Sequence, residues 1–376
     1  MNKTLLFKTS IIVFVTPLLV LILELVLSFY YKKNQNYIIN APGLEYQYNF
    51  NSKYVKNMSG MINVKINSLG ARSSEIADYH QEKIIAIGGS TTECNTTNQP
   101  LTWTEKVQQT LTKNLKREFW VGNFGKSGTT SEHHILQSQE VFKIKELADV
   151  KTVIYLIGFN DALKALHYPK RYSNTPVLDL RKKAFMVYPD KELPYWKRNS
   201  IFKFIKEKRF LWQLKLVDKD IFDERYRKNI EKRKQVKWQE ELPDLSKQIS
   251  EYKKNINTLI SINRTNNKTP IFITQPVLWD SKLDTRLKNL LVFDLFEKIN
   301  YSPSTLAKLM NLFNTALIEV CEEKNIKYID LAKQSAPNWF YDDCHFNLRG
   351  NEKVGEFISQ KLYFLFKVDA AVPTLF

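Results

Sequence analysis

The chain has 376 residues, of which 43% are hydrophobic and 13% aromatic, so it can build a large core and is not a disordered or low-complexity chain. Its formal net charge is +17, yet no helix-turn-helix, zinc or RNA-binding signature accompanies the charge. We therefore expect a globular protein, one large domain with additions, that does not bind nucleic acid.

The first predicted element is an apolar helix from Thr9 to Tyr31, long enough to cross the core of a bilayer. No small-residue cleavage site ends it, which favours an uncleaved anchor over a secretory signal peptide. Glu24 lies within the run and keeps a buried helix of a globular fold as the alternative. Lysines flank both ends, so charge does not decide the orientation. We expect residues 1–33 to be a single-pass anchor that contacts membrane lipid through residues 9–31.

Residues 34–80 are polar and aromatic with several turn signals, and we expect a tether and an irregular lead-in there. From residue 81 onward, strand and helix patterns alternate. Short apolar runs typical of buried parallel strands are residues 83–87, 119–121, 152–157, 270–274 and 326–329. Helical segments separate them. The alternation predicts an α/β domain over residues 81–376, with a parallel sheet covered by helices on both faces.

An addition between the third and fourth predicted strands holds most of the excess charge. Residues 164–240 contain 22 Lys or Arg and 10 Asp or Glu, a surplus of 12 positive charges. With the helical stretch that follows, they predict a basic helical insertion at about residues 164–262. A solvated insertion is one interpretation, and contact with anionic lipid headgroups or an acidic polymer is the other.

The cysteines and most histidines give no indication of a metal site. Cys94, Cys321 and Cys344 have no metal-ligand spacing, and the run 132–134, Glu-His-His, lacks converging partners. We expect neither a metal nor a cofactor. A disulfide between Cys94 and Cys344 stays open, because it needs Cα atoms within about 7 Å of each other.

Ligands of open parallel sheets bind beyond the carboxyl ends of the strands, so the residues there are the first candidates for a site. Ser90 follows a strand and two glycines, a position that exposes its hydroxyl near backbone donors; a plain helix cap is the alternative. His345 has Asp342 three residues before it, a spacing at which a carboxylate can orient the imidazole, although a capped surface loop has the same pattern.

Acyl transfer also needs hydrogen-bond donors for a developing oxyanion. The backbone N–H groups of Ser90 and Gly128 and the side-chain amide of Asn160 are suitable donors. Ordinary turn chemistry is the alternative for the glycine and the asparagine. We expect Asp161, the neighbour of Asn160, to be a structural hydrogen-bonding partner.

Taken together and in order, the segments 88–92, 123–128, 158–161 and 342–345 resemble the four blocks of the SGNH/GDSL hydrolase family. The match covers about residues 60–365 without the insertion. It implies a three-layer α/β sandwich with a flavodoxin-like parallel sheet, the SGNH hydrolase fold. The implied roles are nucleophile for Ser90, the rest of a triad for Asp342 and His345, and an oxyanion hole of Ser90, Gly128 and Asn160.

One departure is Gly89, where the family name implies aspartate; the form Gly-Gly-Ser-Thr-Thr-Glu resembles a membrane-anchored bacterial branch. The resemblance implies a serine esterase that removes acyl groups, acetyl in particular, from a cell-envelope carbohydrate or related ester. Its domain would lie outside the cytoplasm, in the periplasm or at the cell surface. An O-acyltransferase acting on an exported polysaccharide is the first alternative, and a non-catalytic scaffold of polysaccharide assembly is the second.

Overall fold

The computed structural model describes residues 3–31, 35–55, 58–172, 174–216, 221–295 and 299–369. The chain divides into two compact units, a larger one of residues 38–186 and 218–376 and a smaller one of residues 1–37 and 187–217. We call residues 187–217 the α8 segment. The predicted basic insertion is therefore not one body: the α8 segment groups with the N-terminal helix, while the residues before and after it belong to the larger unit.

A five-stranded parallel sheet forms the centre of the larger unit. In order across the sheet, its strands are β4 (Phe119–Asn123), β3 (Glu82–Gly88), β5 (Thr152–Leu156), β7 (Thr269–Ile273) and β9 (Tyr328–Ile329). In chain order, this is second, first, third, fourth and fifth, which is the flavodoxin-like order. The side chains of residues 84–87 are fully buried, as expected of a strand covered on both faces. The predicted fold is confirmed.

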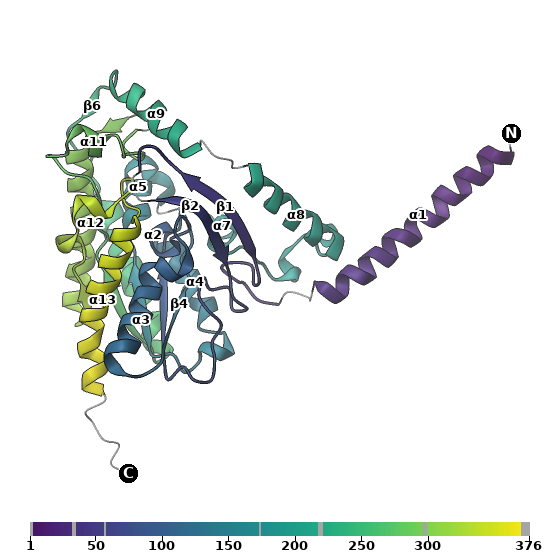
Figure 1. Ribbon diagram of the computed structural model, residues 1–376, viewed down its shortest axis with the longest axis horizontal. Helices are drawn as coiled ribbons and strands as arrows, with labels where there is room; N and C mark the ends of the chain where they lie inside the picture. Colours follow the sequence, from purple (N-terminus) through teal and green to yellow (C-terminus); the bar gives the residue numbers. More distant parts are fainter. Residues whose placement is uncertain are drawn as a thin grey trace, which may run out of the picture. The chain divides into compact units, whose positions relative to one another are not determined.

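Helices flank this sheet in two groups. Helix α3 lies beside α13 (Figure 1), and α10 packs against both α4 and α12. The longer helices of the larger unit are α3 (Trp103–Leu115), α4 (Ser131–Val141), α5 (Phe159–His167), α9 (Ile221–Arg233), α10 (Ser246–Thr265), α12 (Pro303–Glu323) and α13 (Leu348–Asp369). Shorter ones are α2 (Ser90–Glu93), α6 (Pro169–Tyr172), α7 (Val177–Ala184) and α11 (Thr285–Lys288). Single 3₁₀ turns are η1 (Gln99–Leu101), η2 (Lys145–Leu147), η5 (Ala332–Gln334) and η6 (Pro337–Trp339), and the short strands β6 (Trp238–Gln239) and β8 (Asn300–Tyr301) pair with each other.

The lead-in is not irregular, because it contains an antiparallel pair of strands, β1 (Glu45–Asn51) and β2 (Ser59–Lys65) (Figure 1). Phe50 on β1 and Val64 on β2 are buried. The Tyr48 hydroxyl donates to the carbonyl of Asn95 at 2.6 Å, so the strand pair contacts the loop that follows α2. Aromatic side chains that alternate with polar ones along β1 supply this buried face.

The smaller unit contains α1 (Lys3–Tyr30), the 3₁₀ turns η3 (Asp190–Glu192) and η4 (Tyr195–Lys197), and α8 (Ser200–Leu216). The stretch Val13–Tyr30 of α1 has a mean hydropathy of 2.3, and none of it is buried within the protein. This helix is long and apolar enough to cross a membrane, a property that signal sequences share. The predicted apolar helix is thus present, and its exposure argues against a core helix of a globular fold.

Candidate active site

Ser90 is the first residue of α2, directly after β3, at the carboxyl edge of the sheet. Because β3 pairs with β4 on one side and with β5 on the other, the serine follows an interior strand, one strand in from the end of the sheet. The Gly89 carbonyl accepts the backbone N–H groups of Thr92 and Glu93, at 3.1 and 3.0 Å, which closes the turn. The hydroxyl of Ser90 therefore projects from a short, well-fixed helical turn.

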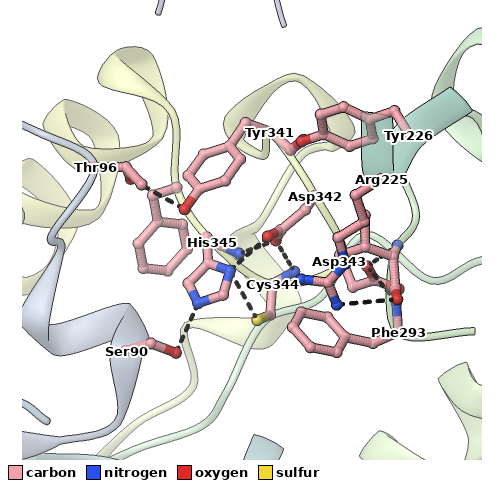
Figure 2. A network of polar contacts seen from close by, with 12 residues as sticks. Ser90, Thr96, Arg225, Tyr226, Phe293, Tyr341, Asp342, Asp343, Cys344 and His345 are labelled. Atoms are coloured by element: carbon pink, nitrogen blue, oxygen red, sulfur yellow. Dashed lines mark hydrogen bonds and ion pairs between the residues drawn. The ribbon is translucent and has the colours of Figure 1, made fainter. Parts of the chain in front are cut away.

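The structure brings Ser90, His345 and Asp342 into one continuous hydrogen-bonded row (Figure 2). The Ser90 Oγ lies 2.6 Å from His345 Nε2, and His345 Nδ1 lies 2.6 Å from Asp342 Oδ2. The other carboxylate oxygen, Oδ1, accepts the backbone N–H groups of Cys344 at 3.0 Å and His345 at 2.8 Å. An ionised carboxylate only accepts, so Nδ1 carries the proton and Nε2 accepts from the serine hydroxyl.

The surroundings of His345 hold its ring in place and tune its charge. The Tyr341 ring stacks on the imidazole with centroids 5.6 Å apart, and the Phe293 ring lies 6.2 Å away. Burial alone lowers the pKa of His345, but the Asp342 carboxylate outweighs it, so that the pKa is raised above the ordinary value of 6.5. His345 is neutral, and can act as a general base, at pH values above its raised pKa.

This charge balance predicts the pH dependence of turnover. His345 can take the Ser90 proton only when its Nε2 is unprotonated, so kcat/KM should fall as the pH drops through its pKa. Because the pKa of His345 is raised, we expect the midpoint of this acid limb above pH 6.5. A profile of kcat/KM against pH for an uncharged ester tests the expectation, and a midpoint below that value would contradict it.

Two of the three candidate oxyanion donors, those of Ser90 and Asn160, border one narrow cavity. Gly89 and Thr129 line it as well, among others. In the part of the chain that the structure describes, the backbone N–H groups of Ser90 and Gly128 donate to no protein acceptor. Asn160 donates one amide hydrogen to the Thr129 carbonyl at 2.9 Å, which fixes the side chain and leaves its second hydrogen available.

The Glu93 side chain, to which the sequence analysis gave no role, supports these donors. Glu93, the last residue of α2, accepts the backbone N–H of Ser127 at 2.8 Å and also the Ser127 hydroxyl, so it ties the nucleophile helix to the loop with Gly128. Gly128 has φ = +72°, which glycine adopts without strain. A Cβ placed there would lie 2.8 Å from the Lys183 Nζ, so a positive charge lies beside this loop.

Behind the site, Arg72 anchors the far end of α2. Its guanidinium is fully buried and donates to the carbonyls of Glu93, Cys94 and Thr97. These carbonyls lie at and just beyond the end of the short helix, where helical carbonyls lose their intrahelical partners. The arginine thus holds the turn that presents Ser90, and the serine keeps its position relative to the sheet.

The departure at Gly89 has a steric explanation. A Cβ on this residue would lie 2.8 Å from the Asn160 Nδ2, closer than real side chains approach. Glycine therefore leaves room for the Asn160 amide next to Ser90, and aspartate at this position would need Asn160 to move. The Asn160 amide cannot move away freely, because it is bonded to Thr129.

Two substitutions follow from this packing. Asn160→Ala should lower kcat on the order of 10²–10³ by removing one oxyanion donor. Gly89→Ala should lower kcat in the same direction by displacing the Asn160 amide, although it leaves every triad residue in place. Steady-state kinetics on an acetyl ester measures both effects. Full kcat in both variants would exclude Asn160 from the oxyanion hole.

The two other buried aspartates near the site are held by donors that have no part in the triad. Asp161 accepts the backbone N–H and hydroxyl of Ser131 and the hydroxyl of Tyr172, and burial raises its pKa to about 6. Asp343 points away from the imidazole (Figure 2) and accepts from the Trp279 indole at 2.7 Å and from the backbone N–H groups of residues 292 and 293. Both carboxylates are structural partners in this arrangement.

The cysteines and the histidine run have structural surroundings. Cys94, Cys321 and Cys344 are free, buried thiols, so the disulfide left open by the sequence is not formed. Asp342, Cys344 and His345 place three ligand-type atoms within 4.8 Å of one another. Two of these atoms, the Asp342 Oδ2 and the His345 Nδ1, are hydrogen-bonded to each other at 2.6 Å. Residues 132–134 lie in the first turn of α4, where the His133 side chain takes part in the capping box.

Comparison with known proteins places this chain in a family. A model described as the GDSL-like Lipase/Acylhydrolase family matches residues 86–353, and the chain belongs to this family of ester hydrolases. None of the curated proteins matches the chain. Among solved structures, an acetylxylan esterase from Geobacillus stearothermophilus is 13% identical, with 75% of this chain and 94% of that chain covered and a TM-score of 0.41. A lipase/acylhydrolase from Enterococcus faecalis is 15% identical, with 76% and 96% covered and a TM-score of 0.40.

Proposed function

We propose that the chain is a serine esterase in which Ser90 is the nucleophile, His345 the general base and Asp342 the residue that orients the imidazole. The observation that carries the proposal is the unbroken row from Ser90 Oγ to Asp342 Oδ2, with 2.6 Å at each step. A serine hydroxyl is a weak nucleophile unless an adjacent base removes its proton, and His345 Nε2 lies in the position for that transfer.

The reaction proceeds through an acyl-enzyme. Ser90 Oγ attacks the ester carbonyl while its proton passes to His345 Nε2, and the oxyanion that forms accepts hydrogen bonds from the donors of Ser90, Gly128 and Asn160. The intermediate then releases the alcohol, which takes the proton from Nε2. Water next gives a proton to Nε2 and attacks the acyl group. The bond to Oγ then breaks, Oγ takes the proton from Nε2, and the carboxylic acid leaves.

The space around Ser90 favours a small acyl group on a polar alcohol. The cavity beside the hydroxyl has a volume of about 10 Å³, room for a group the size of one water molecule. Gln275 lines this cavity and also a second one of about 260 Å³. The second cavity is lined by Trp279, Asp280 and Asn311 among others. An indole with amide and carboxylate groups suits a carbohydrate, so we assign the methyl of the acetyl group to the first space and the sugar to the second.

An O-acyltransferase is the second candidate, and the same polar cavity favours it, because a sugar hydroxyl held there could replace water. The esterase and the transferase are distinguished by incubating full-length protein in detergent with an acetylated oligosaccharide and a deacetylated acceptor. Mass spectrometry then follows both products. Free acetate supports the esterase, and acetylated acceptor supports the transferase. If neither product forms and a fluorophosphonate probe does not label the protein, the activated serine is refuted and the non-catalytic scaffold remains.

For localisation, we propose that the exposed apolar helix α1 is an uncleaved membrane anchor. The proposal that the larger unit lies outside the cytoplasm rests on the resemblance to the membrane-anchored bacterial branch. Reporter fusions after residue 33 test the orientation. We expect a carboxyl-terminal alkaline phosphatase fusion to be active. An inactive phosphatase fusion together with a fluorescent cytoplasmic-type reporter would show that the larger unit lies in the cytoplasm.

A further inference from the structure

Helix α8 packs along the end of α1 in the smaller unit. The Glu24 carboxylate accepts the backbone N–H groups of Ser200 at 2.7 Å and Ile201 at 2.9 Å, at the start of α8. The Tyr31 hydroxyl donates to the Glu207 carboxylate at 2.7 Å. Tyr31 follows Glu24 by seven residues, and Glu207 follows Ser200 by seven residues. The two helices therefore run side by side in the same direction for about two turns.

This contact accounts for the one acidic residue in the apolar helix. From Val13 to Tyr30, every side chain is exposed except those of Glu24 and Leu27, which are partly covered. A carboxylate at membrane depth is costly without a partner, and a helix N-terminus supplies both N–H donors and the positive end of its dipole. The start of α8 is therefore the partner that lets α1 carry a carboxylate.

The exposed side of the α8 segment mixes aromatic and basic side chains. Its sequence has seven aromatic residues and eight Lys or Arg against three Asp or Glu. Trp196 is 62% exposed; on α8, Ile205 and Trp212 are 54% and 60% exposed and, seven residues apart, lie on the same side of the helix. Lys208 and Arg209 are exposed between them. This composition is typical of helices that lie in a membrane interface.

We propose that the α8 segment lies in the headgroup layer of the bilayer that α1 enters and binds anionic lipid there. The inference rests on the proposed anchoring by α1. Glu24 lies seven residues before Tyr31, about 10 Å along the axis, so the first turns of α8 run at the depth of the interface. Trp and Tyr rings favour this layer, and Lys and Arg attract its phosphates.

The path of the chain connects the two units at three points. The chain passes between the two units three times, after residues 37, 186 and 217. An α8 segment held at the bilayer therefore restrains the larger unit at three connections, where α1 alone would restrain it at one. The catalytic domain would work close to the membrane surface and act on substrates that are attached to it or assembled there.

The test measures contact between lipid and individual tryptophans in the full-length chain. The protein is reconstituted in vesicles of phosphatidylcholine and phosphatidylglycerol whose acyl chains carry bromine near the headgroup, which quenches indole fluorescence on contact. Wild type is compared with Trp196→Phe and Trp212→Phe, and with Trp238→Phe as the control in the larger unit. We expect the quenched emission to shrink in the first two variants and to stay unchanged in the control.

Flotation with the vesicles separates this inference from the anchoring on which it rests. Equal quenching in all four proteins that still float with the vesicles overturns the role of the α8 segment and leaves the anchor intact. Release of wild type by alkaline carbonate overturns the anchor itself. Quenching that is equally strong in pure phosphatidylcholine overturns the preference for anionic lipid.

A variant of the helix contact gives a second, independent measurement. Glu24→Ala removes both acceptors of the N–H donors at the start of α8 and makes α1 more apolar, so the chain should still float but lose quenching of Trp196. Undiminished quenching of Trp196 in this variant would show that Glu24 does not hold α8 at the interface.

Discussion

Replacing Ser90 by alanine is expected to abolish fluorophosphonate labelling and to lower kcat for an acetyl ester by about 10⁶-fold. The reason is geometric, because the Ser90 Oγ is the atom hydrogen-bonded to His345 Nε2 and beside the oxyanion donors. Labelling is read by intact mass and turnover by release of acetate.

The matched control is Ser281→Ala, since Ser281 is an exposed serine of the same domain. It should keep both labelling and turnover. Probe uptake by the Ser90→Ala protein would place the nucleophile on another residue and remove the basis of the proposed mechanism.

Asp342→Asn is expected to lower kcat by roughly 10⁴-fold while the protein stays folded. The backbone N–H groups of Cys344 and His345 donate to one oxygen of Asp342 and would keep the amide oxygen of asparagine on that side. The amide NH₂ would then face His345 Nδ1, which could only accept, and the imidazole proton would move to Nε2. This tautomer cannot take a proton from Ser90. Steady-state kinetics beside a thermal melt separates this loss from unfolding.

The neighbouring aspartate supplies the control for that variant. Asp343→Asn places an amide NH₂ among the Trp279 indole and two backbone N–H donors, and the buried mismatch should cost about 1–3 kcal/mol of stability. The pH profile of turnover should keep its acid limb, because Asp342 still holds the imidazole. A loss of turnover in Asp343→Asn and not in Asp342→Asn would make Asp343 the third member of the triad.

The sheet could be predicted from the sequence because its strands are short apolar runs bounded by glycine or polar residues, as in 83–87 and 152–157. Burial on both faces leaves few other interpretations of such runs. The pair β1 and β2 was missed although Tyr46, Tyr48 and Phe50 alternate with polar residues, which is the pattern of a half-buried strand. The turn residues on either side of this segment favour an irregular chain and so obscure its periodicity.

The candidate triad could be predicted because it needs three residue types in fixed positions, and Asp342 precedes His345 at a short spacing. The supporting contacts could not, because they join residues far apart in the chain, such as Glu93 with Ser127 and Gly89 with Asn160. The same holds for Glu24, whose partner lies in the middle of the basic insertion. Side-chain proximity of this kind follows from the folded arrangement and leaves no local signal in the sequence.

The order of the catalytic residues along the chain limits when the enzyme can become active during its synthesis. Ser90 follows the first strand of the sheet, whereas His345 comes from the last loop, and Asn351 on α13 accepts from the backbone of Trp103 at 3.0 Å and from the thiol of Cys94 at 3.3 Å. Helix α13 also packs along α3. A nascent chain therefore has no candidate base beside Ser90 until nearly all of it has been made.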